Sequence, residues 1–310
     1  MANISVVIVS WNTKKFLIEC LESLVSQEES NSMEIIVVDN ASSDGSPEAV
    51  SDQFPIAKLI KNKSNLGFAR ANNIGIEHST GDYICLINSD IKVLSKCTKQ
   101  LYDYMNNNPS IGIIGPKIVN SNLFLQCSCR HFPSLWNNFC SAFGLNRIFP
   151  NSKICSGEQM IYFKHDRIER VDVIAGCFMM VRRKALEQVG YLDEQFFIYS
   201  EDIDWCKRFR DAGWEAIFFP DARAIHYGGA SSSNAPIRFS VEQEKALLQY
   251  WAKHHSKPAQ LTIFIIIILK HLVRLLSGSL LYLIKPSDRR SLTAKIEQHI
   301  ICLRSLLHNC

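Results

Sequence analysis

Short, apolar, β-branched segments that alternate with helical patterns constrain the fold of this chain more than any other feature. Residues 4–10 (ISVVIVS) and 33–40 (MEIIVVDN) have the composition of parallel strands that are buried on both faces, and residues 56–62 and 81–90 continue the series. Apolar residues recur at near-helical spacing after the first strand, and residues 67–79 also have a helical pattern. This alternation predicts an α/β fold with a mostly parallel central sheet flanked by helices.

The second half of the chain has a less regular pattern. Residues 120–165, rich in Asn, Phe, Pro and Cys, are predicted to be an insertion or a mobile segment. Residues 171–183 have the composition of one further buried strand, and residues 184–190 of a short helix. Residues 214–233 are predicted to be a strand that ends in a flexible Gly/Ser segment, and residues 240–255 an amphipathic helix.

Charge is distributed unevenly along the chain. The net charge is +4, but residues 252–310 contain nine lysines and arginines against two acids, a net +7, which leaves −3 for residues 1–251. A weakly acidic body with a basic tail argues against general nucleic-acid binding and predicts a surface partner for the tail. The eleven cysteines lack zinc-knuckle spacing, and the N-terminus lacks the features of a signal peptide, so we expect reduced thiols in a cytosolic setting.

Three polar clusters follow the predicted strands. They are SWN at residues 10–12, DNAS at 39–42 and NSD at 88–90. Each cluster alone is typical of a turn. Because ligands of parallel sheets bind beyond the carboxyl ends of the strands, three such clusters together predict a binding site on one edge of the sheet.

A fourth cluster of polar residues follows an aromatic segment, in FFIYSEDIDWCKR (196–208). Its acids, Glu201, Asp202 and Asp204, stand where a helix is predicted to begin. A structural interpretation is available, since Ser200 or Asp202 could cap the helix and acids suit its N-terminal dipole. The same acids at the mouth of an apolar pocket also suit proton transfer.

The order of these motifs resembles that of family 2 glycosyltransferases with a GT-A fold. It is most similar to the rhamnosyltransferase-like branch that acts on lipid-linked sugars, and the resemblance spans roughly residues 3–230. The pattern GxGxxG is absent, which removes the main support for a dinucleotide-dependent dehydrogenase. The resemblance implies a nucleotide-sugar-binding fold and an inverting glycosyl transfer.

The resemblance also implies which residues hold the nucleotide. The ends of the first two strands would read the base and ribose, and the segment at 65–72 would line the pocket, with Arg70 neutralising phosphate charge. Residues 88 and 89 would complete this set. The expected nucleotide-binding residues are Ser10, Trp11, Asn12, Asp39, Asn65, Gly67, Phe68, Arg70, Asn72, Asn88 and Ser89.

A divalent cation is implied at the end of the fourth strand. The family motif usually has two acids flanking one residue, whereas this chain has Asn88-Ser89-Asp90. Asp90 is therefore expected to be the chief protein ligand, and His226 matches a histidine that adds a second ligand in many relatives. Mg²⁺ or Mn²⁺ fits an oxygen-rich site that is shared with a diphosphate. The alternative for His226 is a structural histidine in the core or a turn.

The catalytic residue implied by the resemblance is Asp202, as the general base that takes the proton of the acceptor hydroxyl. Glu201 and Asp204 are expected to orient the backbone or acceptor hydroxyls. Gly176 and Cys177 are expected to lie near the donor sugar and the acceptor.

The domain prediction follows from the same pattern. Residues 1–239 would form the GT-A catalytic domain, with a nucleotide half at about 1–118 and an acceptor half at about 119–239. Residues 240–310 would form a helical, basic, membrane-associating region.

The tail contains an apolar segment at residues 261–284 that is long enough to cross a bilayer. Lys270, His271 and Arg274 lie near its middle, where cations are costly, so we expect an interfacial or re-entrant helix. The alternative is a helix buried against the catalytic domain or a second subunit. The predicted location is the cytoplasmic face of the inner membrane, peripheral or monotopic.

Three functions are compatible with these residues. The first is transfer of rhamnose from dTDP-rhamnose to a polyprenyl-diphosphate-linked saccharide of a bacterial surface polysaccharide such as O-antigen. The second keeps the enzyme but uses a UDP-hexose donor. The third is a non-catalytic sugar-nucleotide-binding scaffold, which only Asn88 in place of an acid supports.

Overall fold

The first half of the chain builds a parallel sheet from alternating strands and helices. The computed structural model describes residues 3–27, 32–156, 158–284 and 286–308. Strands β1 to β4 pair in parallel in the order β3-β2-β1-β4. The elements are β1 (Ile4–Ser10), α1 (Lys14–Val25), β2 (Met33–Asp39), α2 (Ser46–Gln53), β3 (Lys58–Lys61), α3 (Phe68–Glu77) and β4 (Tyr83–Asn88).

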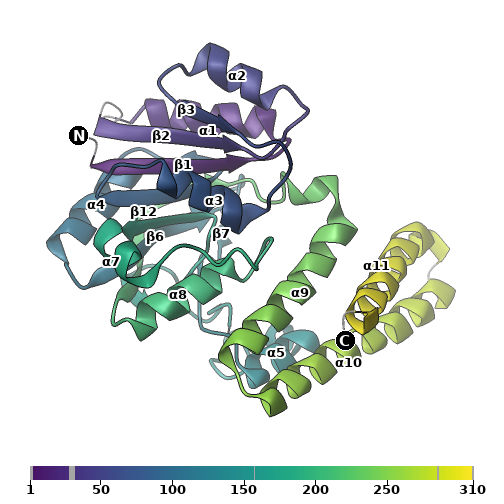
Figure 1. Cartoon of the computed structure of the whole chain (residues 1–310). Coiled ribbons are helices and arrows are strands. Elements are labelled where there is room, and N and C mark those ends of the chain that lie inside the picture. The colour runs from purple at the N-terminus through teal and green to yellow at the C-terminus, as the bar shows by residue number, and fades with distance from the viewer. Residues whose placement is uncertain (1–2, 28–31, 157, 285, 309–310) are drawn as a thin grey trace.

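Both faces of this sheet are buried, as its continuous apolar strands predict. On β1, Val6 and Ile8 pack into a cluster with residues of α1, α2 and α4 (Cys97–Asn107), because alternate side chains of a strand point to the same face. Val7 points to the other face and packs into a cluster with residues of α3, α7 (Arg183–Val189) and α8 (Glu201–Asp211). The result is a three-layer α/β body (Figure 1).

The second half of the chain extends the sheet with mixed strand directions. Strand β11 is antiparallel to both of its neighbours, β4 and β6, whereas β12 is parallel to β6 and antiparallel to β5. Short strands β7 and β9 pair at the margins with β6 and β12. The bounds are β5 (Ile91–Val93), β6 (Ile111–Val119), β7 (Leu125–Gln126), β9 (Glu169–Val171), β11 (Phe178–Arg182) and β12 (Glu215–His226).

The prediction of one continuous strand at residues 171–183 was wrong. Residues Val173–Ile174 form β10, which pairs with β8 (Cys129–Arg130) in a separate two-stranded sheet, and β11 begins only at Phe178. The small residues Ala175 and Gly176 lie at the break. The Gly176 N–H donates to the Asp202 side chain of α8. It is therefore not available to a neighbouring strand, and strand pairing is interrupted there.

The irregular segment at residues 120–165 contains short elements in addition to β7 and β8. Two short helices, α5 (Leu135–Ala142) and α6 (Leu145–Ile148), follow β8. Ser134 caps α5, since its side chain accepts a hydrogen bond of 3.1 Å from the Asn137 N–H.

Three long helices complete the chain: α9 (Pro236–His254), α10 (Lys257–Ile284) and α11 (Arg289–His308). Helix α10 packs against α5, α9 and α11, and α11 also contacts α9. In Figure 1, α10 and α11 form a hairpin that extends away from the sheet, and α5 lies beside the start of α10. Short 3-10 turns, η2 (Ser232–Asn234) and η3 (Pro286–Asp288), precede α9 and α11.

Helix α10 is only partly buried. Ile263, Ile266 and Ile267 pack into the same cluster as Trp251 of α9 and Trp205 of α8, so the base of the tail shares a core with the body. Among the helices of the described residues, α10 is the one whose length and composition would suit a membrane span, and 22% of its apolar window is buried. Core helices of soluble proteins meet the same criterion.

Candidate active site

Two adjoining cavities lie at the carboxyl edge of the parallel strands. The smaller has a volume of about 210 Å³ and the larger about 520 Å³. Five residues line both cavities, so the two share a wall, and together they make up the cleft. The shared residues are Phe68, Asn88, Ile198, Tyr199 and His226.

The smaller cavity collects most of the residues that were predicted to hold the nucleotide or the cation. They come from the ends of β1, β4 and β12 and from the start of α3, elements that are distant in sequence. Predicted residues that line it are Trp11, Asn65, Gly67, Phe68, Asn88, Ser89, Asp90 and His226.

Asn40 organises the wall of this cavity, although the sequence did not single it out. Its side-chain amide donates a hydrogen bond of 2.9 Å to Asn65 Oδ1, and its own oxygen accepts from the Leu66 N–H at 3.0 Å. Asn65 Oδ1 also accepts from the Gly67 N–H at 3.0 Å. This network holds the loop before α3 against the end of β2.

Gly67 allows a close approach of two chain segments. Its φ is +88°, and a Cβ atom there would lie 2.4 Å from the Phe197 carbonyl oxygen. The next residue, Phe68, donates its N–H to that oxygen at 2.6 Å. Only glycine fits this position, because a side chain would displace the segment that leads to α8.

Three predicted nucleotide residues line neither cavity. Ser10 is buried and contacts Thr13, whose hydroxyl lies 2.8 Å from that of Ser89. Asn12 joins two loops by accepting a hydrogen bond of 2.8 Å from the Ser43 N–H. Asp39 is buried and accepts from the Ser42 N–H, while its Oδ1 has no partner among the described residues. The hydrogen bonds of Asn12 and Asp39 hold the loops that follow β1 and β2.

Two others on α3 also lie outside the cleft. Asn72 is buried and donates to the Phe68 carbonyl at 2.9 Å. The half-exposed Arg70 guanidinium lies 3.6 Å from the Glu194 carboxylate. Arg70 lines neither cavity, and its expected contact with phosphate stays a prediction.

Asp90 and His226, predicted as cation ligands, lie together. His226 Nε2 is 3.2 Å from Asp90 Oδ1, and His226 Nδ1 is 2.9 Å from the amide of Gln126. Burial alone would raise the pKa of Asp90, but the hydrogen bond and charge of His226 and the Ala230 N–H lower it below its ordinary value. The Asp90 carboxylate is thereby kept available as a ligand.

The residues around Asp90 fit a hard divalent cation. Asn88 Oδ1 is buried and has no hydrogen-bond partner among the described residues, so it offers one further oxygen. The described residues contain no cluster of three or more His, Cys, Asp or Glu side chains that could hold a metal alone. A cation at Asp90 and His226 would therefore need oxygens from a bound diphosphate.

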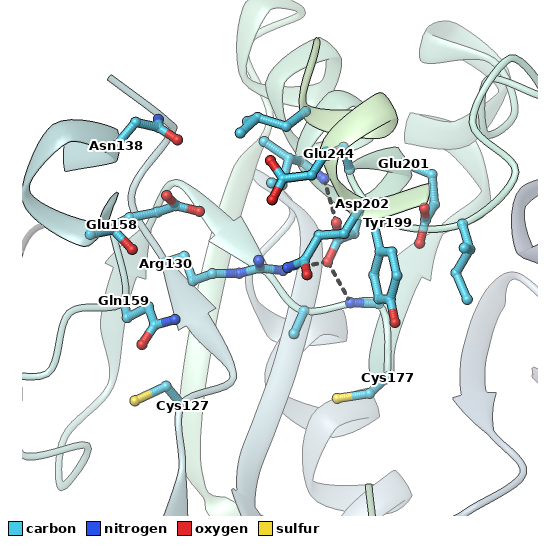
Figure 2. Close-up of a pocket in the computed structure, with 18 of the residues that line it drawn as sticks. Cys127, Arg130, Asn138, Glu158, Gln159, Cys177, Tyr199, Glu201, Asp202 and Glu244 are labelled. Atoms are coloured by element: carbon cyan, nitrogen blue, oxygen red, sulfur yellow. Dashed lines mark hydrogen bonds and ion pairs between the residues drawn. The ribbon is translucent and has the colours of Figure 1, made fainter. Parts of the chain in front are cut away.

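Asp202 lies in the larger cavity and is held at both oxygens. Its Oδ2 accepts a hydrogen bond of 2.6 Å from Arg130 Nη2 and one of 3.0 Å from the Gly176 N–H, and its Oδ1 accepts from the Ile203 N–H at 2.9 Å. Figure 2 shows Arg130 extending to Asp202 from the side of the cavity on which Glu158 and Gln159 lie. Gly176 and Cys177 line the same cavity, and their expected closeness to the donor sugar and the acceptor stays a prediction.

The turn before α8 has an unusual backbone. Tyr199 and Ser200 are consecutive non-glycine residues with φ values of 70° and 63°. Such conformations are costly and concentrate at functional sites. Ser200 makes no side-chain cap hydrogen bond, so its predicted capping role is not observed. The turn instead places Glu201 and Asp202 at the cavity.

Glu201 is the second acid of the pair. Burial, and then the negative charge of Asp202, raise the pKa of Glu201 to about 8. Its Oε2 has no hydrogen-bond partner among the described residues. Glu201 is therefore largely protonated at neutral pH. It lies next to the Asp202 carboxylate, which is paired with the Arg130 guanidinium.

Asp204 does not belong to the cavity, in contrast to the prediction. It is fully buried and contacts Arg208 at 2.8 Å, Lys253 at 2.7 Å and His254 at 2.7 Å. The helical period explains the difference, because a residue two positions after Asp202 points to another face of α8. Asp204 joins α8 to the end of α9.

Several residues of the larger cavity were missed by sequence reasoning. Arg130, Asn138 and Glu158 come from the irregular segment at 120–165, and Glu244 and Lys270 from the tail. Lys270 and Glu244 form an ion pair between α10 and α9. For these residues the sequence offers one signal, the basic Lys270 in the middle of the apolar segment at 261–284. By itself, Lys270 indicates only that inserting this segment into a membrane is costly.

Comparisons with known proteins show which family the sequence matches. The family model described as Glycosyl transferase family 2 matches residues 5–190. The chain is 27% identical over 237 residues to the N-acetylglucosaminyl-diphospho-decaprenol L-rhamnosyltransferase of Mycobacterium tuberculosis, covering 72% of this chain and 75% of that protein. It is also 27% identical over 250 residues to the dTDP-rhamnosyl transferase RfbF of Shigella flexneri, covering 78% and 76%.

A solved structure shares the fold. The mannosyltransferase PcManGT from Pyrobaculum calidifontis, in complex with GDP-Man and Mn²⁺, aligns with a TM-score of 0.57 at 18% identity, and the alignment covers 98% of this chain and 87% of that one. Together with the family match, this likeness confirms the predicted GT-A architecture.

Proposed function

The chain belongs to glycosyl transferase family 2, and on that premise we propose that it is an inverting, metal-dependent glycosyltransferase. The best-supported donor is dTDP-rhamnose, and the best-supported acceptor is a polyprenyl-diphosphate-linked saccharide of a bacterial surface polysaccharide. Two relatives that match more than two thirds of this chain carry rhamnosyl transfer in their names, and one of those names specifies a decaprenol-linked acceptor.

One observation carries the proposal: Asp202 lines one cavity, Asp90 lines the adjoining cavity, and His226 lines both. A nucleotide sugar in the smaller cavity would present its anomeric carbon toward the larger cavity, where the acceptor hydroxyl would lie. Asp202 would take the proton of that hydroxyl as its oxygen attacks from the face opposite the leaving group. A positioned base of this kind contributes about 10²–10⁴-fold to the rate.

The surrounding residues prepare this step. The Gly176 N–H fixes the orientation of Asp202 Oδ2. A Cβ atom at position 176 would lie 3.3 Å from the Asp202 Cβ, so the lack of a side chain on Gly176 allows this close approach. A divalent cation held by Asp90 and His226 would supply positive charge for the departing nucleoside diphosphate. The protonated Glu201 can donate a hydrogen bond to a sugar oxygen without adding negative charge to the cavity.

Purified protein assayed against a panel of dTDP- and UDP-sugars with a diphosphate-linked acceptor tests the proposal. We expect turnover that depends on Mg²⁺ or Mn²⁺, and a loss of about 10²–10⁴-fold in kcat for Asp202→Asn with unchanged donor binding. Asp211→Asn, an exposed acid on the same helix, is the matched control and should retain activity.

Other outcomes would favour the alternatives. Donor binding without turnover in the unmodified protein would favour a scaffold. Turnover with a UDP-hexose but not with dTDP-rhamnose would change the donor and keep the reaction class. Full activity in Asp202→Asn would refute the assignment of the base.

A further inference from the structure

Helices α5 and α10 form one wall of the larger cavity. Asn138, Ser141 and Ala142 of α5 line it, together with Ile266 and Lys270 of α10. The two helices contact each other although more than a hundred residues separate them. A helix with its side chains is about 10 Å across, so the cavity lies about 10 Å from whatever covers the outer faces of these helices.

The outer faces carry large exposed apolar side chains. On α5 and the segment after it, Trp136 is 49% exposed and Phe149 53%, and Ile148 and Ile154 are exposed as well. On α10 the exposed set continues from the base of the helix to its end, and the side chain of Leu276 is 74% exposed. The exposed apolar residues of α10 include Leu261, Ile265, Leu269, Leu272, Leu276 and Leu283. An apolar surface of this extent marks an interaction site.

The segments that carry these apolar side chains contain basic residues and no acidic ones. Residues 132–156 contain Arg147 and Lys153 but no Asp or Glu. Residues 245–287 likewise contain no acid, and their cations include Lys257 and Arg274. Exposed apolar side chains on segments whose charged residues are all basic fit an anionic lipid bilayer, whose head groups attract basic residues near the surface. Tryptophan, as at position 136, is enriched at the membrane–water interface.

The packing of the tail favours lying on the bilayer over crossing it. Helix α11 contacts α10 and returns to α9, and it carries charged residues such as Arg290, Lys295 and Glu297. Lys270 is tied to Glu244 of α9, and His271 is buried. A crossing α10 would have to lose these polar contacts or take α11 into the hydrocarbon.

We propose that the outer faces of the segment 135–154 and of α10 form a single docking surface for an anionic bilayer. The cavity with Asp202 then lies one helix thickness from the membrane. This inference deepens the proposed function, since a saccharide that occupies the cavity can remain attached to a lipid in the bilayer. The segment 135–154, which lies within residues 120–165 that were predicted to be an insertion or a mobile acceptor-side segment, thus becomes the second membrane contact.

Vesicle co-sedimentation of the full chain tests the surface without any enzyme assay. We expect binding to vesicles of phosphatidylcholine and phosphatidylglycerol, weaker binding to phosphatidylcholine alone, and weakening with added salt. Trp136→Ser with Phe149→Ser should reduce binding about tenfold or more, because each ring leaves an apolar environment. Leu276→Ser with Leu283→Ser should have a similar effect.

Ile56→Ser is the matched control, since Ile56 is 55% exposed and lies between α2 and β3, in the first half of the chain. It should leave vesicle binding unchanged. Circular dichroism of every variant checks that the fold is retained. Equal binding by the Trp136/Phe149 variant and the unmodified chain would overturn the inference, and so would a dimer in light scattering that these substitutions dissociate.

A comparison of two acceptors separates this inference from the proposed function. The Trp136/Phe149 variant should keep turnover on a water-soluble, short-chain acceptor and lose it on the same saccharide carried by a long-chain lipid in vesicles. Absence of turnover by the unmodified chain on either acceptor would refute the proposed function, while vesicle binding would still report on the surface. An equal loss on both acceptors would overturn the link between docking and acceptor delivery.

Discussion

Arg130 Nη2 lies 2.6 Å from Asp202 Oδ2, which ties the short strand β8 to the first turn of α8 across 72 positions of sequence. The guanidinium side chain is 26% exposed and the carboxylate side chain 9%, so the ion pair is largely shielded from solvent. Asp202 is therefore positioned by a residue from the segment with the least regular sequence pattern, and the shape of the larger cavity depends on that segment.

Replacement of Arg130 by Gln should reduce transfer. The substitution removes the cation from a site that also contains Glu158, Glu201 and Asp202, and a misplaced base can cost about 10²-fold. Because the Arg130 charge opposes the rise in the pKa of Glu201, its loss should raise that pKa further. We expect kcat to fall more than KM rises. Arg130→Lys, which keeps the charge but not the two-nitrogen fork, should restore part of the rate.

The pH dependence of kcat distinguishes positioning from a general structural role. A variant that only unfolds would lose activity at every pH, whereas Arg130→Gln should change the shape of the profile. A rate equal to or above that of the unmodified enzyme across the whole profile would show that Arg130 restrains the base and does not position it.

The raised pKa of Glu201 predicts that the folded chain becomes less stable as pH rises. The ordinary pKa of 4.5 is raised to about 8 in the folded chain, so between these values the unfolded state releases its proton first and the free energy of unfolding decreases. Each unit of pKa difference corresponds to about 1.4 kcal/mol. Glu201→Gln cannot ionise and should lose this dependence, which urea denaturation across the same pH range would measure.

The free energy of unfolding of Glu201→Gln is compared with that of the unmodified chain at each pH. The two proteins should differ little near the lower end of the range, and the Gln variant should be the more stable near the upper end. Parallel stability curves would mean that Glu201 ionises in the folded state as easily as in the unfolded state, and would contradict the assigned burial effect.

The cation site predicts a coupling between metal and diphosphate. Asp90→Asn and His226→Ala should each weaken Mn²⁺-dependent binding of the nucleoside diphosphate and lower turnover by at least about 10²-fold, since the cation supplies several kcal/mol to the leaving group. Titration calorimetry with and without EDTA measures this. Asp103→Asn, an exposed acid paired with Lys99 on α4, is the control. Diphosphate binding that ignores both EDTA and the Asp90 substitution would exclude the site.

The fold could be predicted because its signals are local. Continuous apolar strands such as residues 4–10 and 33–39 are buried by the helices that follow them, and the ends of these strands meet at one edge by the geometry of parallel pairing. The family motifs also pointed to Asp90 and His226 as one pair. Asp90 follows β4 and His226 ends β12, and the two side chains are in contact in the folded chain.

The parts that could not be predicted depend on side-chain direction and on long-range pairing. No local pattern shows that Arg130 would reach Asp202, because β8 pairs with β10 more than forty residues later. Arg70 and Asp204 were assigned from motif membership, whereas Arg70 on α3 lies beside Glu194 and the helical period directs Asp204 to α9. Motifs predicted which elements build the cleft better than which side chains face it.

The contacts of Asp204 predict that helix α9 contributes to the stability of the α/β body. Its fully buried carboxylate accepts from Arg208, Lys253 and His254, so Asp204→Asn would leave three donors without their counter-charge. Breaking a buried ion pair by removing one partner costs about 3–5 kcal/mol, and the partial exposure of Lys253 places the expected loss near 3 kcal/mol. Thermal or urea unfolding would measure it.

Asp211→Asn isolates this effect on the same helix. Asp211 pairs with Lys207 at 2.8 Å, but its side chain is 52% exposed, and such surface pairs contribute about 0–1 kcal/mol. The difference between the two variants therefore reports the burial of the α8–α9 contact and not the loss of a negative charge from α8. Asp204→Asn should also increase protease cleavage within α9, since Lys253 and His254 hold its last turn to α8. Equal stability of the two variants would show that α9 is held to the body by its apolar residues alone.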